Sequence, residues 1–342
     1  MKRREVLQTI AAAGAFSAAG PVACAAPAPQ PNKESVTDTP VILECAINGS
    51  TTKAKNPLAP ETVEEQTAEI IRCLDAGATI VHVHSNKPNE DPEIAAKAYA
   101  DVFRPVWKKH PSAILYATAN FDPIVYNRTR RAWTGDVQCG HQRILAEAGL
   151  ANMVLFDTGV VPLAGYDENG KPAPESAFFW YGFWPDDWQV IKQTCDDLGT
   201  GASISVFEPG WMKNVLAMVR AGTLPRGSKL NIYFAPDSFA AMAPPIPEGL
   251  ELYLKMMEGM DLKWSVGSIG EPSIMDTPLA KMALERGGSF RVGLEDWGTG
   301  PSNVEQIERA KEIIGAVGRP IVTGAEAIEY LDIRFAATRP EA

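Results

Sequence analysis

The segment VILECAINGSTTKAKNPLAPETVEEQTAEIIRCLDAGATIVHVH, residues 41–84, decides the fold. It opens with an apolar, β-branched run at 41–47 that is typical of a buried strand. Apolar residues with helical spacing follow over 63–77 and end at a glycine. A second apolar run at 79–84 completes a strand–helix–strand unit, the building block of parallel α/β folds.

The same alternation continues along the chain. Further strands are predicted at 113–119, 152–157, 202–207, 229–235, 262–268 and 289–294, and helices at 91–109, 139–149, 185–199, 211–222, 249–259, 273–288 and 303–318. Eight strand–helix units in about 280 residues predict a single (β/α)8 TIM barrel over 41–342. The alternative is an open doubly wound sheet, which is less favoured because no glycine-rich nucleotide motif follows the first strand.

An export signal is predicted ahead of the barrel. Residues 1–26 combine a basic start (MKRR) with a short Ala/Gly-rich run and small residues at a cleavage site, and are interpreted as a twin-arginine-type signal peptide. The alternative is a frayed amphipathic helix, and the run is too short for a membrane span. Residues 27–40 are interpreted as a linker. We expect a periplasmic product, with lipid anchoring at Cys24 disfavoured by Pro21.

Composition limits the partners of the protein. The 342 residues are 45% hydrophobic and 22% charged, with a net charge of −10 and a pI near 5.1. This acidic balance argues against nucleic acid as a partner. Five widely spaced cysteines without a CxxC motif do not indicate a disulfide framework.

Two long loops, 120–136 and 158–185, follow predicted strands and so lie on the catalytic face of a barrel. The second loop is dense in aromatic residues, which is typical of a lid, a pocket wall or a subunit interface. We expect a homo-oligomer.

Two of the four histidines form the V-H-V-H sequence at the end of the second strand. Residues i and i+2 of a strand share a face, so His82 and His84 are predicted to project together into the barrel mouth. Because histidine is a common zinc ligand, a metal site is favoured over two histidines hydrogen-bonded to backbone. The remaining two, His110 after a basic helix end and His141 within a helix, are interpreted as structural.

The last strand supplies the rest of the predicted site. It ends in RVGLED at 291–296 and flanks the first strand, which flanks the second. Glu295 is the predicted third ligand of a His₂Glu zinc site, a ligand set that also suits iron or manganese. Arg291, on the same strand face as Glu295, could orient Glu295 or bind a substrate carboxylate, and Asp296, at the strand-to-loop junction, could act as a general base. The alternative for both acids is a surface turn or a helix N-cap.

With these residues placed, the chain resembles the β-keto acid cleavage enzyme family, whose founding activity is 3-keto-5-aminohexanoate cleavage. The resemblance covers about residues 41 to 335 and rests on AINGSTTKAKNPLAPETVEEQTAEIIRCLDAGATIVHVH and GGSFRVGLEDW. It implies a zinc TIM barrel with His82, His84 and Glu295 as ligands and Asp296 as catalytic base. It also matches Arg291 to a family arginine, and places Thr118 where the family has a serine.

The resemblance implies that a β-keto acid chelates zinc and exchanges a two-carbon unit with acetyl-CoA, giving acetoacetate and a new acyl-CoA. A basic CoA entrance would use Lys53, Lys55 and the arginines at 128–131. The chain departs from the family where Ser85 and Asn86 follow the histidines, and where Ser50, Thr51 and Thr52 replace an expected glutamate. These departures and the leader keep two alternatives open: a CoA-independent metal-dependent C–C lyase or hydrolase, and a non-catalytic periplasmic metal or carboxylate binder.

Overall fold

A computed structural model describes most of the chain from residue 36 onward, all of it within one compact unit, Glu34–Ala342. The predicted signal peptide and most of the predicted linker lie outside the described residues. Described are residues 36–85, 87, 89–120, 134–163, 165–166, 169–171, 179–236, 239 and 241–335. The short 3-10 helix η1 (Val36–Asp38) precedes the first strand.

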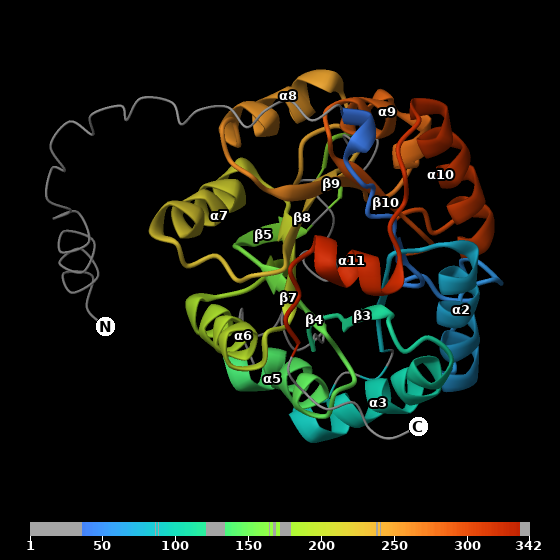
Figure 1. The fold of residues 1–342 in the computed structure, drawn as a ribbon, viewed down its shortest axis with the longest axis vertical. Helices are drawn as coiled ribbons and strands as arrows, with labels where there is room; N and C mark the ends of the chain where they lie inside the picture. The colour runs from blue at the N-terminus through green and yellow to red at the C-terminus, as the bar shows by residue number, and fades with distance from the viewer. Residues whose placement is uncertain are drawn as a thin grey trace, which may run out of the picture. The chain divides into compact units, whose positions relative to one another are not determined.

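An eight-stranded parallel sheet curls into a nearly closed barrel, consistent with the predicted TIM barrel (Figure 1). The strand order is β3-β2-β1-β10-β9-β8-β7-β4, so the last barrel strand does flank the first, as expected from the sequence. The strands are β1 (Glu44–Ala46), β2 (Ile80–Val83), β3 (Ile114–Ala117), β4 (Met153–Asp157), β7 (Gly201–Val206), β8 (Ser228–Phe234), β9 (Lys263–Ser268) and β10 (Ser289–Val292).

One side chain bridges the place where the barrel ladder is incomplete, between β3 and β4. The Asn152 carboxamide accepts a hydrogen bond from the Leu115 backbone N–H at 3.2 Å and donates to the Ala113 carbonyl at 2.9 Å. Buried backbone groups need partners, and Asn152 supplies them where the two strands do not pair.

Helices surround the strands in a ring (Figure 1). Five of the described helices begin at a proline, which is favoured at the first helical position because its missing N–H has no partner there in any case. The bounds are α2 (Val63–Ala76), α3 (Pro92–Lys109), α5 (Gly135–Glu147), α6 (Pro185–Leu198), α7 (Pro209–Ala221), α8 (Pro247–Met256), α9 (Pro278–Glu285) and α10 (Asn303–Val317). The predicted helix at 273–288 is divided into the 3-10 helix η3 (Ile274–Asp276) and α9.

The last part of the chain covers the amino-terminal end of the barrel. Ile321 bridges to Val41, and the Val322 carbonyl accepts a hydrogen bond from Thr79, which precedes β2. Helix α11 (Gly324–Tyr330) follows, and Ile333 packs beside Gly201 at the start of β7. The amino-terminal end is therefore capped, which leaves the carboxyl ends of the strands for the site.

The predicted long loop at 158–185 contains a β-hairpin, which the sequence pattern does not predict. Strand β5 (Val160–Leu163) pairs antiparallel with β6 (Phe179–Gly182) in a sheet separate from the barrel. Gly182, with φ of 124°, lies so close to the Gly159 carbonyl that no side chain fits there. Part of the aromatic stretch therefore forms a strand, β6, instead of a coil.

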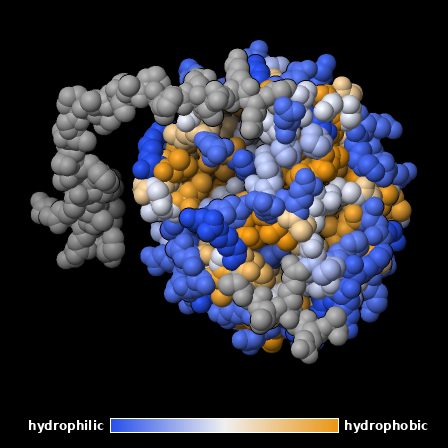
Figure 2. All heavy atoms as spheres, viewed as in Figure 1, coloured by the Kyte–Doolittle hydropathy of each residue, from blue (hydrophilic) through white to orange (hydrophobic). Residues whose placement is uncertain are grey.

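On the face shown in Figure 2, hydrophobic residues gather in several patches between hydrophilic ones. Within the described part of the chain, no helix is long and apolar enough to cross a membrane.

Candidate metal centre and active site

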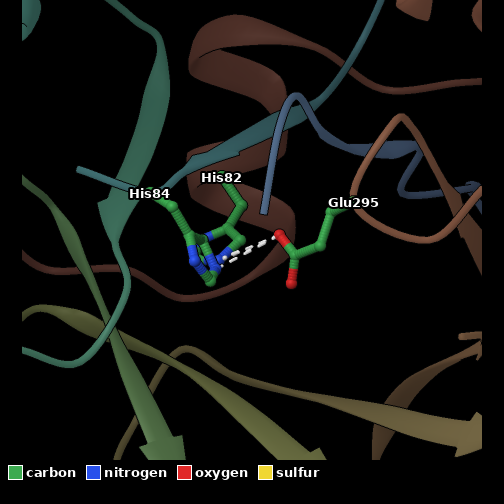
Figure 3. A group of neighbouring side chains, drawn as sticks. All are labelled: His82, His84 and Glu295. Carbon is green, nitrogen blue, oxygen red and sulfur yellow. Dashed lines mark ion pairs between the residues drawn. The ribbon is translucent and has the colours of Figure 1, made fainter. Parts of the chain in front are cut away.

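The two histidines and Glu295 converge at the carboxyl ends of neighbouring strands, as predicted. His82 lies in β2, His84 follows its end, and Glu295 lies in the turn after β10. Oε2 of Glu295 is 3.4 Å from Nε2 of His82 and 3.4 Å from Nε2 of His84. Figure 3 shows the two imidazole rings side by side and the carboxylate facing them.

These distances fit a metal ion better than a direct contact. Zinc binds nitrogen and oxygen ligands at about 2.0–2.1 Å, so two ligand atoms of a tetrahedral site lie about 3.3–3.4 Å apart. Oε2 of Glu295 is also buried without a hydrogen-bond partner among the described residues. An unsatisfied carboxylate oxygen at that spacing from two ring nitrogens is suited to a divalent cation.

The protonation states suit ligation. Burial lowers the pKa of His82 from 6.5 to about 3, so its imidazole is neutral and can bind a metal. Burial opposes ionisation of Glu295, but Arg291 and the two histidines hold the pKa of this carboxyl well below 4.5. A neutral imidazole and an ionised carboxylate are the forms in which these side chains act as ligands.

Glu295 reaches the histidines by a tight turn rather than by strand alternation. Strand β10 ends at Val292, and Gly293 has φ of 131°, so Glu295 does not simply share a strand face with Arg291 as predicted. The Glu295 N–H donates to the Ala46 carbonyl at 3.1 Å. Gly49, with φ of 53°, leaves the space that the Glu295 side chain occupies, which explains a glycine at this point of the N-G-S-T-T-K turn.

Asn48 of the same turn holds the backbone of His84. Its carboxamide accepts from the His84 N–H and donates to the His84 carbonyl, both at 2.9 Å. The His82 ring stacks on Tyr116 with centroids 4.3 Å apart. Nδ1 of His82 is buried and has no partner among the described residues, so stacking rather than a second hydrogen bond orients this ring.

Arg291 is buried and connects the acids of the site. Its Nη2 is 2.9 Å from Oε1 of Glu295 and 2.7 Å from Oδ1 of Asp296, and its Nε donates to Asp296 at 3.0 Å. Of the two roles predicted for Arg291, orienting Glu295 is therefore the one that this geometry supports. Asp296 is buried next to Glu295, and burial raises the pKa of Asp296 from 3.8 to about 6.

A second ion pair lies deeper in the barrel and was not predicted. Nζ of Lys229 is 2.6 Å from Oε2 of Glu44, and both side chains are fully buried. Glu44 also accepts from the Tyr116 hydroxyl at 2.5 Å and from Nη1 of Arg291 at 3.4 Å. The only sequence signal was a single charge inside each of two apolar strand runs, ILECAI and KLNIYFA.

The charges of this interior do not balance. Among the groups joined by ion pairs, and with each ionised, Lys229 and Arg291 supply two positive charges against three carboxylates, Glu44, Glu295 and Asp296. A divalent cation would compensate the excess negative charge of this group. The donor set and its charge therefore both fit a metal ion.

Thr118 follows the end of β3 and lies beside His84 of the metal centre. It lines a small pocket of about 80 Å³ together with His84, Tyr99, Asn120 and Tyr181. Its carbonyl contacts Nε2 of His141 at 2.7 Å, which confirms the structural interpretation of that histidine.

Two remaining predictions concern residues outside the centre. His110 ends α3 with Nε2 3.0 Å from Asp75, in agreement with its predicted place at a helix end. Of the suggested CoA entrance, Lys53 forms an ion pair with Glu65, and the arginines at 128–131 lie outside the described residues.

The nearly closed parallel barrel, with catalytic-type residues at the carboxyl ends of its strands, defines an α/β-barrel enzyme with a site able to hold a metal. A family model described as beta-keto acid cleavage enzyme matches residues 40–333. The chain belongs to this family of enzymes that cleave β-keto acids, which confirms the resemblance found in the sequence.

Characterised relatives match over most of their length. The chain is 27% identical to the 3-oxoadipate:acetyl-CoA acetyltransferase of Cupriavidus necator, over 86% of this chain and 95% of that protein. It is 24% identical to the 3,5-dioxohexanoate:acetyl-CoA acetone transferase of Paraburkholderia graminis, over 88% and 98%. It is 23% identical to the 3-keto-5-aminohexanoate cleavage enzyme of Acetoanaerobium sticklandii, over 86% and 98%.

Among solved structures, the apo structure of ObcA is similar with a TM-score of 0.55 and 17% identity, over 80% of this chain. The chain spans 65% of that longer protein, so it covers less than two thirds of it. This likeness supports the barrel fold alone.

Proposed function

We propose that the protein cleaves a β-keto acid in a zinc-dependent acyl transfer with acetyl-CoA, giving acetoacetate and a new acyl-CoA. The observation that carries the proposal is the His82–His84–Glu295 cluster in a chain of this family. Two of the relatives are named for reactions with acetyl-CoA, and a third is named a cleavage enzyme.

In the proposed reaction, the bond between C2 and C3 of the β-keto acid breaks. C2 forms a bond with the acetyl carbonyl carbon, and the released acyl group forms a thioester with CoA. The balance needs no oxidant and no water. A divalent cation held by His82, His84 and Glu295 would act as a Lewis acid toward the keto and carboxylate oxygens of the substrate.

The side chains around the cluster have separate tasks in this scheme. Arg291 holds Glu295 and Asp296 at fixed positions through its planar, multiple hydrogen bonds. Asp296 takes the substrate proton and later returns it, as a general base and acid. Thr118 offers a hydroxyl at the pocket wall beside His84.

The proposal is tested with metal-loaded protein and a panel of three β-keto acids: 3-keto-5-aminohexanoate, 3,5-dioxohexanoate and 3-oxoadipate. Each is assayed with and without acetyl-CoA, and acetoacetate and acyl-CoA are measured by mass spectrometry. We expect acetoacetate only when acetyl-CoA and metal are both present. Cleavage without acetyl-CoA would instead indicate the lyase or hydrolase alternative, and tight metal binding without turnover would indicate the binder. The relatives favour neither alternative.

We also propose that residues 1–26 direct export to the periplasm. Fractionation of cells that express the full chain and an Arg3→Lys/Arg4→Lys variant tests this proposal, because a twin-arginine signal depends on both arginines. Retention of the variant in the cytoplasm is expected. Equal distribution of the two proteins would contradict export by this route.

A further inference from the structure

Glu44 lies one layer below the metal centre in the interior of the barrel. Its strand, β1, runs between β2 and β10, the two strands whose ends carry the metal ligands. Ala46 is level with His82 on β2, whereas Glu44 is level with Ile80 on β2 and with Arg291 on β10. Residues i and i+2 of a strand share a face, so Glu44 is placed one layer below His82. The Glu44 side chain is fully buried, so any role in the site is exerted through the residues that it contacts.

One oxygen of Glu44 connects to both kinds of metal ligand. Oε1 accepts a hydrogen bond from the Tyr116 hydroxyl at 2.5 Å and another from Nη1 of Arg291 at 3.4 Å. The Tyr116 ring lies against the His82 imidazole, with centroids 4.3 Å apart and an angle of 25° between the planes. Nη2 of Arg291 is 2.9 Å from Oε1 of Glu295. A single carboxylate oxygen is therefore one residue away from His82 on one side and from Glu295 on the other.

The contact through Tyr116 takes the place of the support that a metal-binding histidine usually has. Such a histidine commonly donates its other ring N–H to a carboxylate or a carbonyl, which fixes the plane of the ring. Nδ1 of His82 is buried and has no partner in the part of the chain that the structure describes. The plane of His82 therefore depends on the stacked Tyr116 ring, and the hydrogen bond to Glu44 fixes where that ring lies.

The other oxygen of Glu44 is also bound, which opposes rotation of the carboxylate. Oε2 is 2.6 Å from Nζ of Lys229 and accepts a hydrogen bond from Nδ2 of Asn231 at 3.4 Å. The Asn231 carboxamide also donates to Oγ of Ser203 at 3.0 Å, and Ser203 donates to the Tyr116 hydroxyl at 3.0 Å. Hydrogen bonds in such a closed network restrict one another, so Glu44 and Tyr116 are fixed before a metal ion binds.

We propose that Glu44 is a positioning residue of the metal centre. It holds His82 through Tyr116, and it holds Glu295 through Arg291. The inference rests on the proposed function, because it takes the predicted ligands as the site of a divalent ion. Removal of Glu44 releases both contacts at once, so Oε2 of Glu295 and Nε2 of His82 no longer keep their spacing of 3.4 Å. Weaker metal binding and an altered coordination geometry follow.

The experiment compares the wild type with Tyr116→Phe and with the double variant Glu44→Met/Lys229→Met. Zinc affinity is measured by competition with a chelator, and the visible spectrum of the cobalt(II)-loaded protein reports the coordination geometry. The double variant should keep most of its stability toward urea, because no charge of the pair is left unpaired, but should bind zinc about 10- to 100-fold more weakly. Tyr116→Phe keeps the stacked ring and removes only the hydroxyl, so we expect a smaller loss of affinity. Both variants should change the cobalt spectrum.

Tyr253→Phe is the matched control, because it removes the hydroxyl of another buried tyrosine, on α8 outside the barrel strands. It should leave the zinc affinity and the cobalt spectrum unchanged. A stable double variant with the zinc affinity and the cobalt spectrum of the wild type would overturn the inference. If the double variant does not fold, Tyr116→Phe keeps the test valid, and an unchanged affinity and spectrum in that variant would overturn the inference instead.

The same measurements separate this inference from the proposed reaction. Zinc binding that depends on Glu44, in a wild type that forms no acetoacetate, would refute only the proposed reaction. Turnover by a wild type whose zinc affinity does not depend on Glu44 would refute only the positioning role.

Discussion

The two sides of the barrel mouth both carry buried carboxylates, and they differ in what compensates the charge. On the β10 side, Glu295 and Asp296 share Arg291, which keeps them in place. On the β4 side, the hydroxyls of Ser205 and Tyr181 lie beside Asp157, and burial raises its pKa from 3.8 to about 6. The comparison indicates that the β10 side is organised around a buried cation, which suits a metal centre, whereas the β4 side buries an acid beside hydroxyl groups.

The largest effect on activity is expected from a substitution of Glu295, on the β10 side of the barrel mouth. Glu295→Gln keeps the shape of the side chain but removes the charge that attracts a cation. Since a bound metal contributes several kcal/mol to catalysis and about 1.4 kcal/mol is a factor of ten, kcat/KM should fall at least about 10³-fold. Steady-state assays with excess metal measure this loss, with the exposed Glu258→Gln as control. A variant within tenfold of the wild type would contradict the assigned ligand.

The buried ion pair between Glu44 and Lys229 tests whether the pairing of charges stabilises the fold on the β10 side of the barrel mouth. Glu44→Gln leaves Lys229 charged and buried, and we expect a loss of about 4 kcal/mol in the free energy of unfolding, measured with urea. The double variant Glu44→Met/Lys229→Met should recover most of it, because no charge is then left unpaired. Recovery of less than half would show that the pair does more than compensate charge.

The stability that the Glu44–Lys229 pair contributes should depend on pH. Burial acts to raise the pKa of Glu44, but Lys229 and Arg291 together lower it from 4.5 to about 2. A carboxyl with a depressed pKa in the folded state stabilises above the unfolded value and loses this contribution as the pH falls. The wild type should therefore lose stability between pH 4.5 and 2 to a greater extent than Glu44→Gln.

Asp157 should show the opposite pH dependence. Its pKa is raised in the folded state, so its protonated form contributes stability that is complete below pH 3.8 and is lost as the pH rises through about 6. A shift of this size corresponds to about 3 kcal/mol. Chemical denaturation between pH 4 and 7 should show a larger decline in the wild type than in Asp157→Asn, in which Asp296, with a pKa also raised to about 6, still contributes. Parallel curves would mean that Asp157 is compensated after all.

The smallest effect is expected for a substitution of Arg291 that keeps its positive charge but not the planar arrangement of its hydrogen bonds. Arg291→Lys preserves one positive charge but cannot contact Glu295 and Asp296 together in one plane. Outer residues that orient metal ligands typically change metal affinity by about 10- to 100-fold, and we expect a loss in this range by competition with a chelator. An unchanged affinity would show that the turn around Gly293 alone positions Glu295.

The fold and the metal cluster could be predicted because both depend on local patterns. Eight alternating strand and helix runs indicate the barrel, and the neighbouring positions of the last, first and second strands predict that His82, His84 and Glu295 lie close together. The tight turn at Gly293, which brings Glu295 to the histidines, was not predicted by strand alternation. The family resemblance added Thr118, which lines a pocket together with His84. The roles of Asp296 and Thr118 in catalysis stay predictions.

The remaining features depend on contacts between distant segments. Asn48 is an ordinary turn residue until its carboxamide meets His84, and Glu44 is explained only by Lys229 and Arg291 on other strands. The hairpin was missed because its strands are separated by a long connection and its aromatic residues suit a loop as well as a strand. Tyr181 lies beside Asp157 because that hairpin forms, so the surroundings of Asp157 could not be predicted from the sequence.

The central claim is that His82, His84 and Glu295 bind one divalent metal ion. Its most direct test is the metal content of purified protein by mass spectrometry after zinc loading and removal of free metal, for the wild type, His82→Ala/His84→Ala and a His110→Ala control. The account predicts about one zinc per chain in the wild type and the control, and essentially none in the double variant, since a single carboxylate does not hold zinc. A double variant that still binds one zinc per chain would contradict it.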